Sequence, residues 1–553
     1  MSEARNGARS WLPCGSAAGY DPAKEQETEG RPALSYIQRI GIAIGIAKGT
    51  TKGITMGVTL AIAGVTLVIA QANATSAAPR DRFFWLSEIN KASAVMLVER
   101  GIVPKPLGAK FFEAITRVEA TGDRPGAARS GDYLKVEQDL MAVGGPDISR
   151  LHSGRSRQDI GSTTQRLITR DDFLAAFGTL NGMREAVLAL AAQAPDAIMP
   201  AYTWGVQAQP ITLGHYASAY MNALDRQAAR MREAWGRLNR SPLGAAALAT
   251  SSFPVDRPRL ADLLGFDAPV ENSLDANQIS PIDGGAEIAG LATSAALTLG
   301  ALIADVTAQY AQTEPWIVLS EGNETGVSSI MPQKRNPSGL VRLRGEASTL
   351  IGEATTFVVI AHNVEPRMSD YKDFGNPKEY PDTILRDMAA LFAHADALIR
   401  NLRFRPERAL EEVNGDYSTT TELADTLQRD ADVPFRIGHH FASELVNYGR
   451  GHHLHASQIP YAEAQRIYAE IAAGAKLDPK LPLSEDAFRR ALTAENMVAA
   501  SKGLGGPQPA EVARMLKAAG ERLAADRAWL DATLAKLADA TQKLDQAFAR
   551  LRE

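Results

Sequence analysis

Cysteine is nearly missing from this chain, and its scarcity excludes two kinds of architecture. The 553 residues include a single cysteine, Cys14, which lies in an atypical N-terminal stretch. Neither a disulfide framework nor a cysteine-based metal site can therefore be built. Aromatic residues are also sparse, at 6%, whereas alanine and leucine are abundant. This mixture favours helices over sheets.

A strong charge of either sign is missing as well. The formal net charge is −5, so the composition does not indicate a nucleic-acid partner held by general basicity. Apolar residues make up 45% of the chain and charged residues 22%, the balance of an ordinary soluble globular protein. The length allows more than one packed region.

The first 78 residues differ from the rest and are interpreted as a leader. Residues 1–34 are polar and rich in Gly, Pro and Glu, which is typical of disorder. An uncharged run, residues 53–70, then follows a basic stretch and precedes an Ala-x-Ala site at Ala72–Ala74. The segment 53–78 resembles a secretory signal peptide and predicts export to the periplasm. The alternatives are a retained membrane anchor and a buried glycine-rich helix of a cytoplasmic protein.

From about residue 85 onwards the apolar pattern is helical. Thr212–Arg240 has apolar residues three to four positions apart, and Asp283–Gln312 is almost entirely small and apolar, so burial on most sides is expected. Ser338–His362 and Asp382–Leu402 predict two further long helices. We find no marked period-two strand pattern and no internal repeat. The sequence therefore predicts an all-α fold with a central bundle of long helices.

Turn-rich residues between Pro406 and Asp416 indicate a boundary near the end of the bundle. After the leader we expect three helical domains, at residues 79–160, 161–408 and 409–553, with the bundle in the middle one. Arg522–Arg550 is predicted to be a separate amphipathic helix within the last domain.

One polar loop, Gly322–Pro337, lies between two of the apolar helices and carries hydroxyl groups and an ammonium group. Asn336 followed by Pro337 predicts a helix start, with Asn336 as the N-cap. The positive end of the next helix would then point back at the loop, close to Lys334. Hydroxyls, an ammonium group and a helix N-terminus together suit a carboxylate substrate.

The same loop resembles the signature of the fumarase/aspartase superfamily, Gly-Ser-Ser-x-Met-Pro-x-Lys-x-Asn-Pro, except that Val327 stands at the first Gly. Leu151–Asp159 is similar to the His-Thr-Gly-Arg-Ser-Arg-Asn-Asp run of argininosuccinate lyases, and Ala201–His215 to their Gly-Tyr-Thr-His…Gln-Pro…Leu-Gly-His block. Further blocks match in order between about residues 85 and 520: Ser241–Gly244, Phe253–Arg257, Glu271–Ala276, and Val433–Arg436 with His439. The chain is thus identified as an argininosuccinate lyase-like member of the superfamily.

The resemblance implies a β-elimination that cleaves a carbon–nitrogen bond and releases fumarate, without a cofactor or metal. It implies that Ser328 is the base, assisted by Lys334, because a serine hydroxyl is a poor base in water. It places these residues at the substrate: Asn336, Ser329, Met331, Ser156, Arg157, Gln158, Thr203, Trp204 and Lys372. It also implies that three chains build each site, and hence a homotetramer that binds a small dicarboxylate or amino-acid substrate.

The chain departs from the lyase pattern where the leaving amine would bind. Trp204 stands at the position of the catalytic His, and because indole cannot act as a base we expect a pocket wall. Gln158 replaces an Asn, and the segment Asn277–Asp283 is longer than in the lyases. Val364 and Ser369 replace the Tyr and Gln of the segment that holds the arginine half. The residues therefore predict a lyase for argininosuccinate or, as we prefer, for a related N-substituted aspartate.

The same residues are also compatible with two other functions. Trp204 and Val327 also suit a carboxymuconate cycloisomerase, because some relatives of that type carry Trp at this position. The missing His equally permits a non-catalytic binding protein on the same fold. The cluster of His452, His453 and His455 is not accompanied by a carboxylate pattern, so we interpret it as a solvated turn rather than a metal site.

Overall fold

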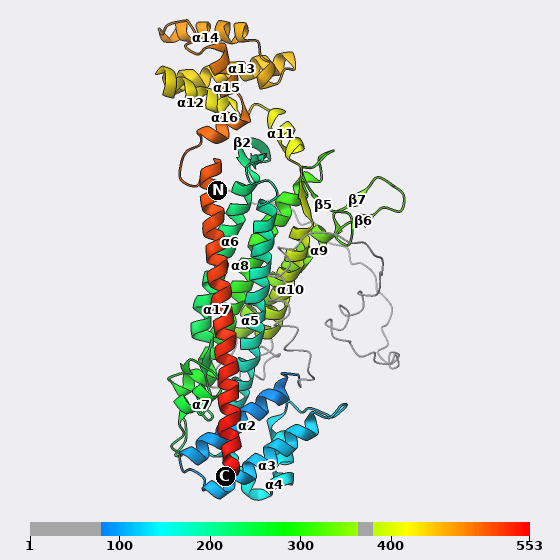
Figure 1. Ribbon diagram of the computed structural model, residues 1–553, viewed down its shortest axis with the longest axis vertical. Helices are drawn as coiled ribbons and strands as arrows, with labels where there is room; N and C mark the ends of the chain where they lie inside the picture. Colours follow the sequence, from blue (N-terminus) through cyan, green and yellow to red (C-terminus); the bar gives the residue numbers. More distant parts are fainter. Residues whose placement is uncertain (1–78, 363–379) are drawn as a thin grey trace, which may run out of the picture. The chain divides into compact units, whose positions relative to one another are not determined.

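The computed structural model describes residues 79–362 and 380–553 (Figure 1). Within these residues the secondary structure is mainly α-helical, which confirms the predicted all-α fold. The predicted leader and the residues Val364, Ser369 and Lys372 lie outside the described residues.

Long helices form the central bundle, as their apolar patterns predicted. They are α5 (Arg157–Ala191), α6 (Leu213–Leu238), α8 (Ser280–Gln309), α9 (Ser338–Ala361), α10 (Tyr380–Arg400) and α17 (Pro509–Ala549). Helix α5 packs along α10, and α8 packs along α9 (Figure 1). Their inward faces share one continuous core, in which Phe177, Phe357 and Phe392 are fully buried. Burial of a side chain of this size contributes about 1.5–3 kcal/mol.

Helix α8 is less buried than its composition predicted. With the turn before it, Asp275–Gln309 is the single helix among the described residues whose length and composition would suit a membrane span. Its most apolar window has a mean hydropathy of 1.6 and is half buried. The other half faces outward, where Leu297 is 62% exposed. An apolar helix with one buried face and one open face is typical of an interface between chains.

A smaller helical layer packs where α5 begins. It consists of α2 (Arg82–Glu99), α3 (Lys105–Gly122), α4 (Tyr133–Gly144), η2 (Pro146–His152) and α7 (Arg257–Leu263). Its core contains Met96 and Phe111 together with Ile160 of α5 and Leu544 of α17. The start of α5 and the end of α17 are therefore embedded in this layer.

The helices after the bundle have a core of their own. They are α11 (Pro406–Asn414), α12 (Thr420–Ala431), α13 (Phe435–His452), η5 (Ala456–Gln458), α14 (Tyr461–Ala475), α15 (Glu485–Ala491) and α16 (Ala494–Ala500). Phe441, Tyr468 and Phe488 lie at its centre. The C-cap residues Asp432, His453 and Lys476 adopt the left-handed conformation, so three of these helices end in tight turns without glycine.

Helix α17 differs from its prediction. The separate helix expected over Arg522–Arg550 is the later part of a longer helix that begins at Pro509. This helix lies along α5 and α6 and reaches α2 (Figure 1). The charged face of this helix was expected to be exposed to solvent. Part of that face is instead buried against residues of other helices, which the local sequence pattern does not reveal.

A buried ion-pair network accounts for this packing. Arg184 of α5 is fully buried and donates to Asp526 of α17 at 2.7 Å and to Asp225 of α6 at 2.5 Å. Arg522 of α17 donates to the other oxygen of Asp225 at 2.6 Å. Charges removed from water need such partners, because an unpaired buried ion costs several kcal/mol.

Short strands also occur, although the sequence predicted none. The longest are β1 (Ile198–Thr203) and β2 (Val206–Thr212), which form an antiparallel hairpin. Pro200 pairs with Pro210 beside a register shift in this hairpin. Prolines interrupt the period-two pattern, which explains why the strands were missed. The remaining pairs are β3 (Arg240–Ser241) with β4 (Ala268–Pro269), β5 (Ile317–Leu319) with β8 (Leu402–Phe404), and β6 (Gly326–Val327) with β7 (Arg335–Asn336).

The ion-pair network leads to a stability prediction. Asp526→Ala should lower the free energy of unfolding by about 3–5 kcal/mol, because it leaves the Arg184 guanidinium buried with fewer partners. Chemical denaturation followed by circular dichroism measures this change. Asp531→Ala, at an exposed position of the same helix, is the matched control and should change stability by less than about 0.5 kcal/mol. Equal effects of the two variants would contradict the prediction.

Candidate active site

The first group of predicted site residues lies at the start of α5. Ser156 is the N-cap, and its side-chain oxygen accepts the backbone N–H of Gln158 at 3.2 Å. Arg157 is exposed, and Gln158 is partly buried. Next to them, buried Arg155 donates to Asn90 at 2.9 Å. Arg155 thus ties this turn to α2, and the neighbouring side chains are left at the surface.

The second group lies on the β1–β2 hairpin. Thr203 ends β1, and the turn consists of Trp204 and Gly205, with φ of 57° and 74°. Two left-handed residues in a two-residue hairpin define a type I′ turn, which favours Asn-Gly over a bulky first residue. The indole of Trp204 is 101% exposed. The turn therefore holds a large aromatic ring in solvent at a conformational cost.

The part of the hairpin next to the turn contacts other elements. The ring of Tyr202 stacks on Trp316 with 6.0 Å between centroids, and its hydroxyl donates to Glu412 at 3.3 Å. Gln207 donates to the backbone oxygen of Glu412 at 2.7 Å. Burial and the Glu412 carboxylate raise the pKa of Tyr202, so the phenol stays protonated as a donor. The hairpin is thus a rigid support for Trp204.

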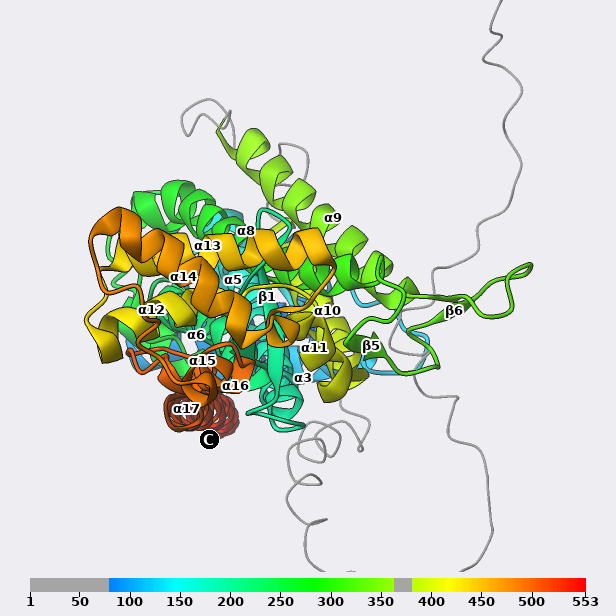
Figure 2. The same cartoon turned by 90° about the horizontal axis from the view of Figure 1, so that it is seen from above.

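The third group lies on the signature loop, which β6 and β7 close into a hairpin that projects from the bundle (Figure 2). The side-chain oxygen of Ser328 accepts the backbone N–H of Met331 at 3.0 Å and that of Ile330 at 3.4 Å. Two such donors stabilise negative charge on this oxygen. Ser329, Met331 and Lys334 are exposed, and the Lys334 ammonium has no ion-pair partner among the residues that the structure describes.

The helix end behind this loop corrects a prediction. Pro337, not Asn336, is the N-cap of α9, and Asn336 instead pairs with Gly326 in the short sheet. The buried Glu324 lies against the first turn of α9 and forms a salt bridge with Arg342 at 2.8 Å. The backbone oxygen of Glu324 accepts the N–H of Gly339 in this turn, and its carboxylate lies beside the helix end that was predicted to face a substrate carboxylate.

A single chain does not bring the three groups together. Helix α5 has 35 residues, so it spans about 52 Å at 1.5 Å per residue. Ser156 stands before its first residue, and the β1–β2 hairpin follows its last turn (Figure 1). The signature loop follows β5 at the hairpin end, because Trp316 beside β5 contacts Tyr202. Two groups thus share one end of the bundle, and the third lies at the other.

Two buried side chains beside the first group were not singled out from the sequence. Asp159 accepts three backbone N–H groups, and Asn277 donates to the backbone oxygens of Ala246 and Ala247 at 2.8 and 2.9 Å. Asn277 lies in a π-helical turn, Asp275–Ile279, that continues into α8. Such a turn accommodates extra residues without breaking a helix, which explains how this longer segment fits.

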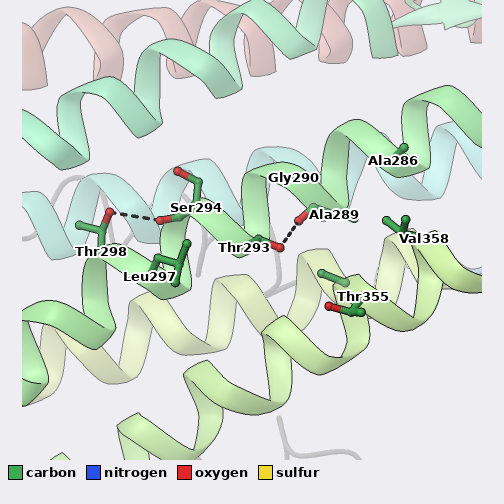
Figure 3. A pocket seen from close by; sticks show the side chains of 10 residues that line it. Ala286, Ala289, Gly290, Thr293, Ser294, Leu297, Thr298, Thr355 and Val358 are labelled. Atoms are coloured by element: carbon green, nitrogen blue, oxygen red, sulfur yellow. Dashed lines mark hydrogen bonds between the residues drawn. The ribbon is translucent and has the colours of Figure 1, made fainter. Parts of the chain in front are cut away.

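A surface groove of about 570 Å³ lies between α8 and α9 (Figure 3). Small and apolar residues line it, among them Ala286, Gly290 and Leu297 of α8 and Val358 of α9. The hydroxyls of Thr293 and Thr298 donate to backbone oxygens of their own helix (Figure 3). The groove therefore offers few polar contacts to a small ligand, and it contains none of the predicted site residues.

Comparison with known proteins decides the family. Residues 142–352 match the family model for lyases, and residues 417–499 match that for the argininosuccinate lyase C-terminal region. The structure of EDDS lyase in complex with formate is similar over 85% of this chain and 92% of that one, with 30% identity and a TM-score of 0.75. This chain belongs to the fumarase/aspartase superfamily. It is an argininosuccinate lyase-like member.

Two further superfamily structures are informative. A variant of EDDS lyase with bound fumarate is 31% identical, covers the same shares of both chains and has a TM-score of 0.75. A 3-carboxy-cis,cis-muconate lactonizing enzyme from Pseudomonas putida is 19% identical over 80% of this chain and 95% of that one, with a TM-score of 0.62. The similarity to the lactonizing enzyme establishes only that the two proteins share a fold.

The strained hairpin turn leads to a second prediction. Trp204→Asn should stabilise the isolated chain by about 1 kcal/mol, because Asn tolerates the left-handed conformation better than Trp. The midpoint of thermal unfolding measures this change. Val206→Asn, at an exposed strand position of the same hairpin, should not stabilise the protein. Destabilisation by Trp204→Asn would mean that the indole is buried against another molecule in solution.

Proposed function

We propose that the protein is a carbon–nitrogen lyase that releases fumarate from an N-substituted aspartate by β-elimination. The observation that carries this proposal is the signature loop, where the Ser328 side-chain oxygen accepts two backbone N–H groups and Lys334, six residues on, supplies an exposed cation. The sequence similarity to EDDS lyase, of which one variant holds fumarate, supports the same reaction type.

In the proposed reaction the Ser328 side chain, in its deprotonated form, takes a proton from the carbon beside one substrate carboxylate and becomes a hydroxyl. The electron pair first adds charge to that carboxylate, and the bond from the neighbouring carbon to nitrogen then breaks. The amine leaves with a proton, and the carbon skeleton leaves as fumarate. Lys334 and Asn336 would hold the carboxylates, because the intermediate carries two negative charges on one group and needs fixed donors and a cation.

The remaining donors would come from other copies of the chain. The Ser156–Gln158 turn and Thr203 are too far apart to contact one small dicarboxylate within a single chain. Antiparallel packing of copies through α8 and α9 would bring the α5 start of one beside the loop of another. The exposed apolar residues of these helices, Leu297, Val341 and Val358, support such packing. We therefore propose a homotetramer with shared sites, as the resemblance implied.

The half of the proposed site that would bind the leaving amine supports a substrate other than argininosuccinate. Trp204 gives this half an aromatic wall in place of an imidazole, so the proton for the leaving amine would come from another side chain or from water. Ser329, Met331 and Arg157 are proposed to line the substrate, and Lys372 keeps that role as a proposal. EDDS, after which the relative is named, is the first compound to test among aspartate adducts.

We also propose export through the segment 53–78. N-terminal sequencing of the native protein tests this idea independently of catalysis. A new N-terminus after the Ala72–Ala74 site is expected. An intact N-terminus in a cytoplasmic fraction would contradict it.

Ser328→Ala should reduce fumarate release by a factor of about 10² to 10⁴, because it removes the proposed base. Ultraviolet absorbance of fumarate, followed with EDDS, argininosuccinate and other aspartate adducts, measures the rate. Binding of fumarate should persist in the variant, which calorimetry checks. Ser348→Ala is the matched control, since this serine of α9 is exposed and its hydroxyl donates to the backbone oxygen of Arg344 in its own helix.

The same assay separates the alternatives. Trp204 and Val327 favour a carboxymuconate cycloisomerase as the second candidate, and loss of muconate absorbance without fumarate would support it. Binding of carboxylates without turnover of any compound would favour a non-catalytic protein. Cleavage of argininosuccinate at the rate of a housekeeping lyase would contradict the proposed change of substrate.

Leu297→Glu should break the proposed tetramer into smaller species, because it places a charge on an apolar contact surface. Size-exclusion chromatography with light scattering measures the mass. Leu534→Glu, at a position of α17 that is 44% exposed, is the matched control and should leave the mass unchanged. A wild-type chain that is already monomeric would contradict the proposed shared site.

A further inference from the structure

Asp159 joins two segments that are far apart in the sequence. One carboxylate oxygen accepts the backbone N–H of Ser156 at 2.8 Å and completes the capping box of α5. The other oxygen accepts the N–H groups of Gly244 and Ala246 at 2.8 and 3.1 Å. The side chain is fully buried, so water does not compete for these bonds.

The loop on the far side of Asp159 needs external support. Gly244 and Ala246 both have left-handed φ values, 83° and 53°, and the alanine pays a steric cost for this conformation. Asn277 holds the backbone oxygens of Ala246 and Ala247, and Ser273 holds that of Leu248 at 3.0 Å. The segment 244–248, which we call the support loop, is therefore anchored by its N–H groups to α5 and by its oxygens to the turn before α8.

We propose that Asp159 is a positioning residue for the elimination. It links the Ser156–Gln158 turn to the support loop. This link keeps the groups of that turn that bind substrate in their correct positions. The proposal rests on the proposed function, because that function assigns Ser156, Arg157 and Gln158 to the substrate. Asp159 itself is buried and does not contact substrate.

A carboxylate suits this role better than an amide of the same shape. Two acceptor oxygens serve three N–H groups, whereas an amide offers one acceptor and turns an NH₂ donor toward the remaining N–H. The charged groups that face Asp159 are Arg155 and Arg257, and both favour its ionised form. Neither donates a hydrogen bond to it, since Arg155 binds Asn90 and Arg257 binds backbone oxygens.

Ionisation of Asp159 connects the position of the turn to pH. Burial raises the pKa of Asp159 to about 6, and the backbone N–H groups and Arg155 only partly offset this effect. Because the pKa is raised in the folded state, this group favours folding below its ordinary pKa of 3.8, and that contribution is lost as the pH rises through about 6. At neutral pH the charge of Asp159 therefore does not stabilise the fold. Removing this charge by substitution should not lower the free energy of unfolding.

The test uses Asp159→Asn in the full-length protein. We expect faster hydrogen exchange at residues 244–248, a KM for EDDS that rises roughly tenfold or more, and a smaller change in kcat. The acidic limb of kcat/KM near pH 6 should disappear in the variant. The dissociation constant for fumarate, which does not depend on turnover, should rise in parallel. Asp531→Asn, which removes an exposed carboxylate of α17, is the control and should leave KM and loop exchange unchanged.

Unchanged exchange at residues 244–248 would overturn the coupling between the two segments. Faster exchange with an unchanged KM and unchanged fumarate binding would overturn the positioning role, since the tie would then be structural alone. A wild-type protein that binds fumarate but cleaves no aspartate adduct would overturn the proposed function. In that case fumarate affinity in Asp159→Asn still decides whether Asp159 positions the carboxylate-binding turn.

Discussion

The length of α5 sets how far apart the predicted site residues of one chain lie. An unbroken helix of 35 residues holds its two ends about 52 Å apart, which is far more than a dicarboxylate can bridge. The turn at Ser156 and the hairpin that carries Thr203 therefore serve different places in space. In the proposed reaction the missing groups come from other copies of the chain. The exposed apolar face of α8 and α9, with its groove of small residues, is the surface on which such copies can pack.

The ends of helices decide where positive charge is available. Ser156 and Asp159 accept backbone N–H groups at the start of α5, and the backbone oxygen of Glu324 accepts the N–H of Gly339 in the first turn of α9. The Glu324 carboxylate lies beside this turn and is paired with Arg342. The exposed Lys334 ammonium on the loop is a further positive charge in this region.

One strained turn and several exposed apolar residues lie in the segments of the predicted chemistry. Trp204 is fully exposed on a left-handed turn, and Val327 and Ile330 of the signature loop are 80% and 83% exposed. The bundle, by contrast, is densely packed and includes the buried Arg184 network. Exposed apolar groups on firmly supported turns are costly for an isolated chain, and they are consistent with surfaces that a second chain or a substrate covers.

The amino-acid sequence was sufficient for the helices of the bundle, because their apolar residues recur with the helical period over long stretches. It was also sufficient for the family, since ten consecutive loop residues and several ordered blocks resemble it. It was not sufficient for features that depend on distant partners. The cap of α9 moved from Asn336 to Pro337 because Asn336 pairs with Gly326, and the β1–β2 hairpin escaped notice because prolines interrupt its alternation. Helix α17 joined the bundle through Arg184, which lies 342 residues from Asp526.

The residues and their spacing therefore indicate the kind of chemistry: a serine loop with a lysine, in a chain of long helices. Local composition and spacing carry that information, because each residue type has the same donors, acceptors and charge wherever it folds. Folding places the predicted site residues at opposite ends of one chain, sets Glu324 beside the start of α9, and lets Asp159 tie two distant segments together. These outcomes follow from packing and hydrogen bonding between residues far apart in the chain, which local patterns do not encode.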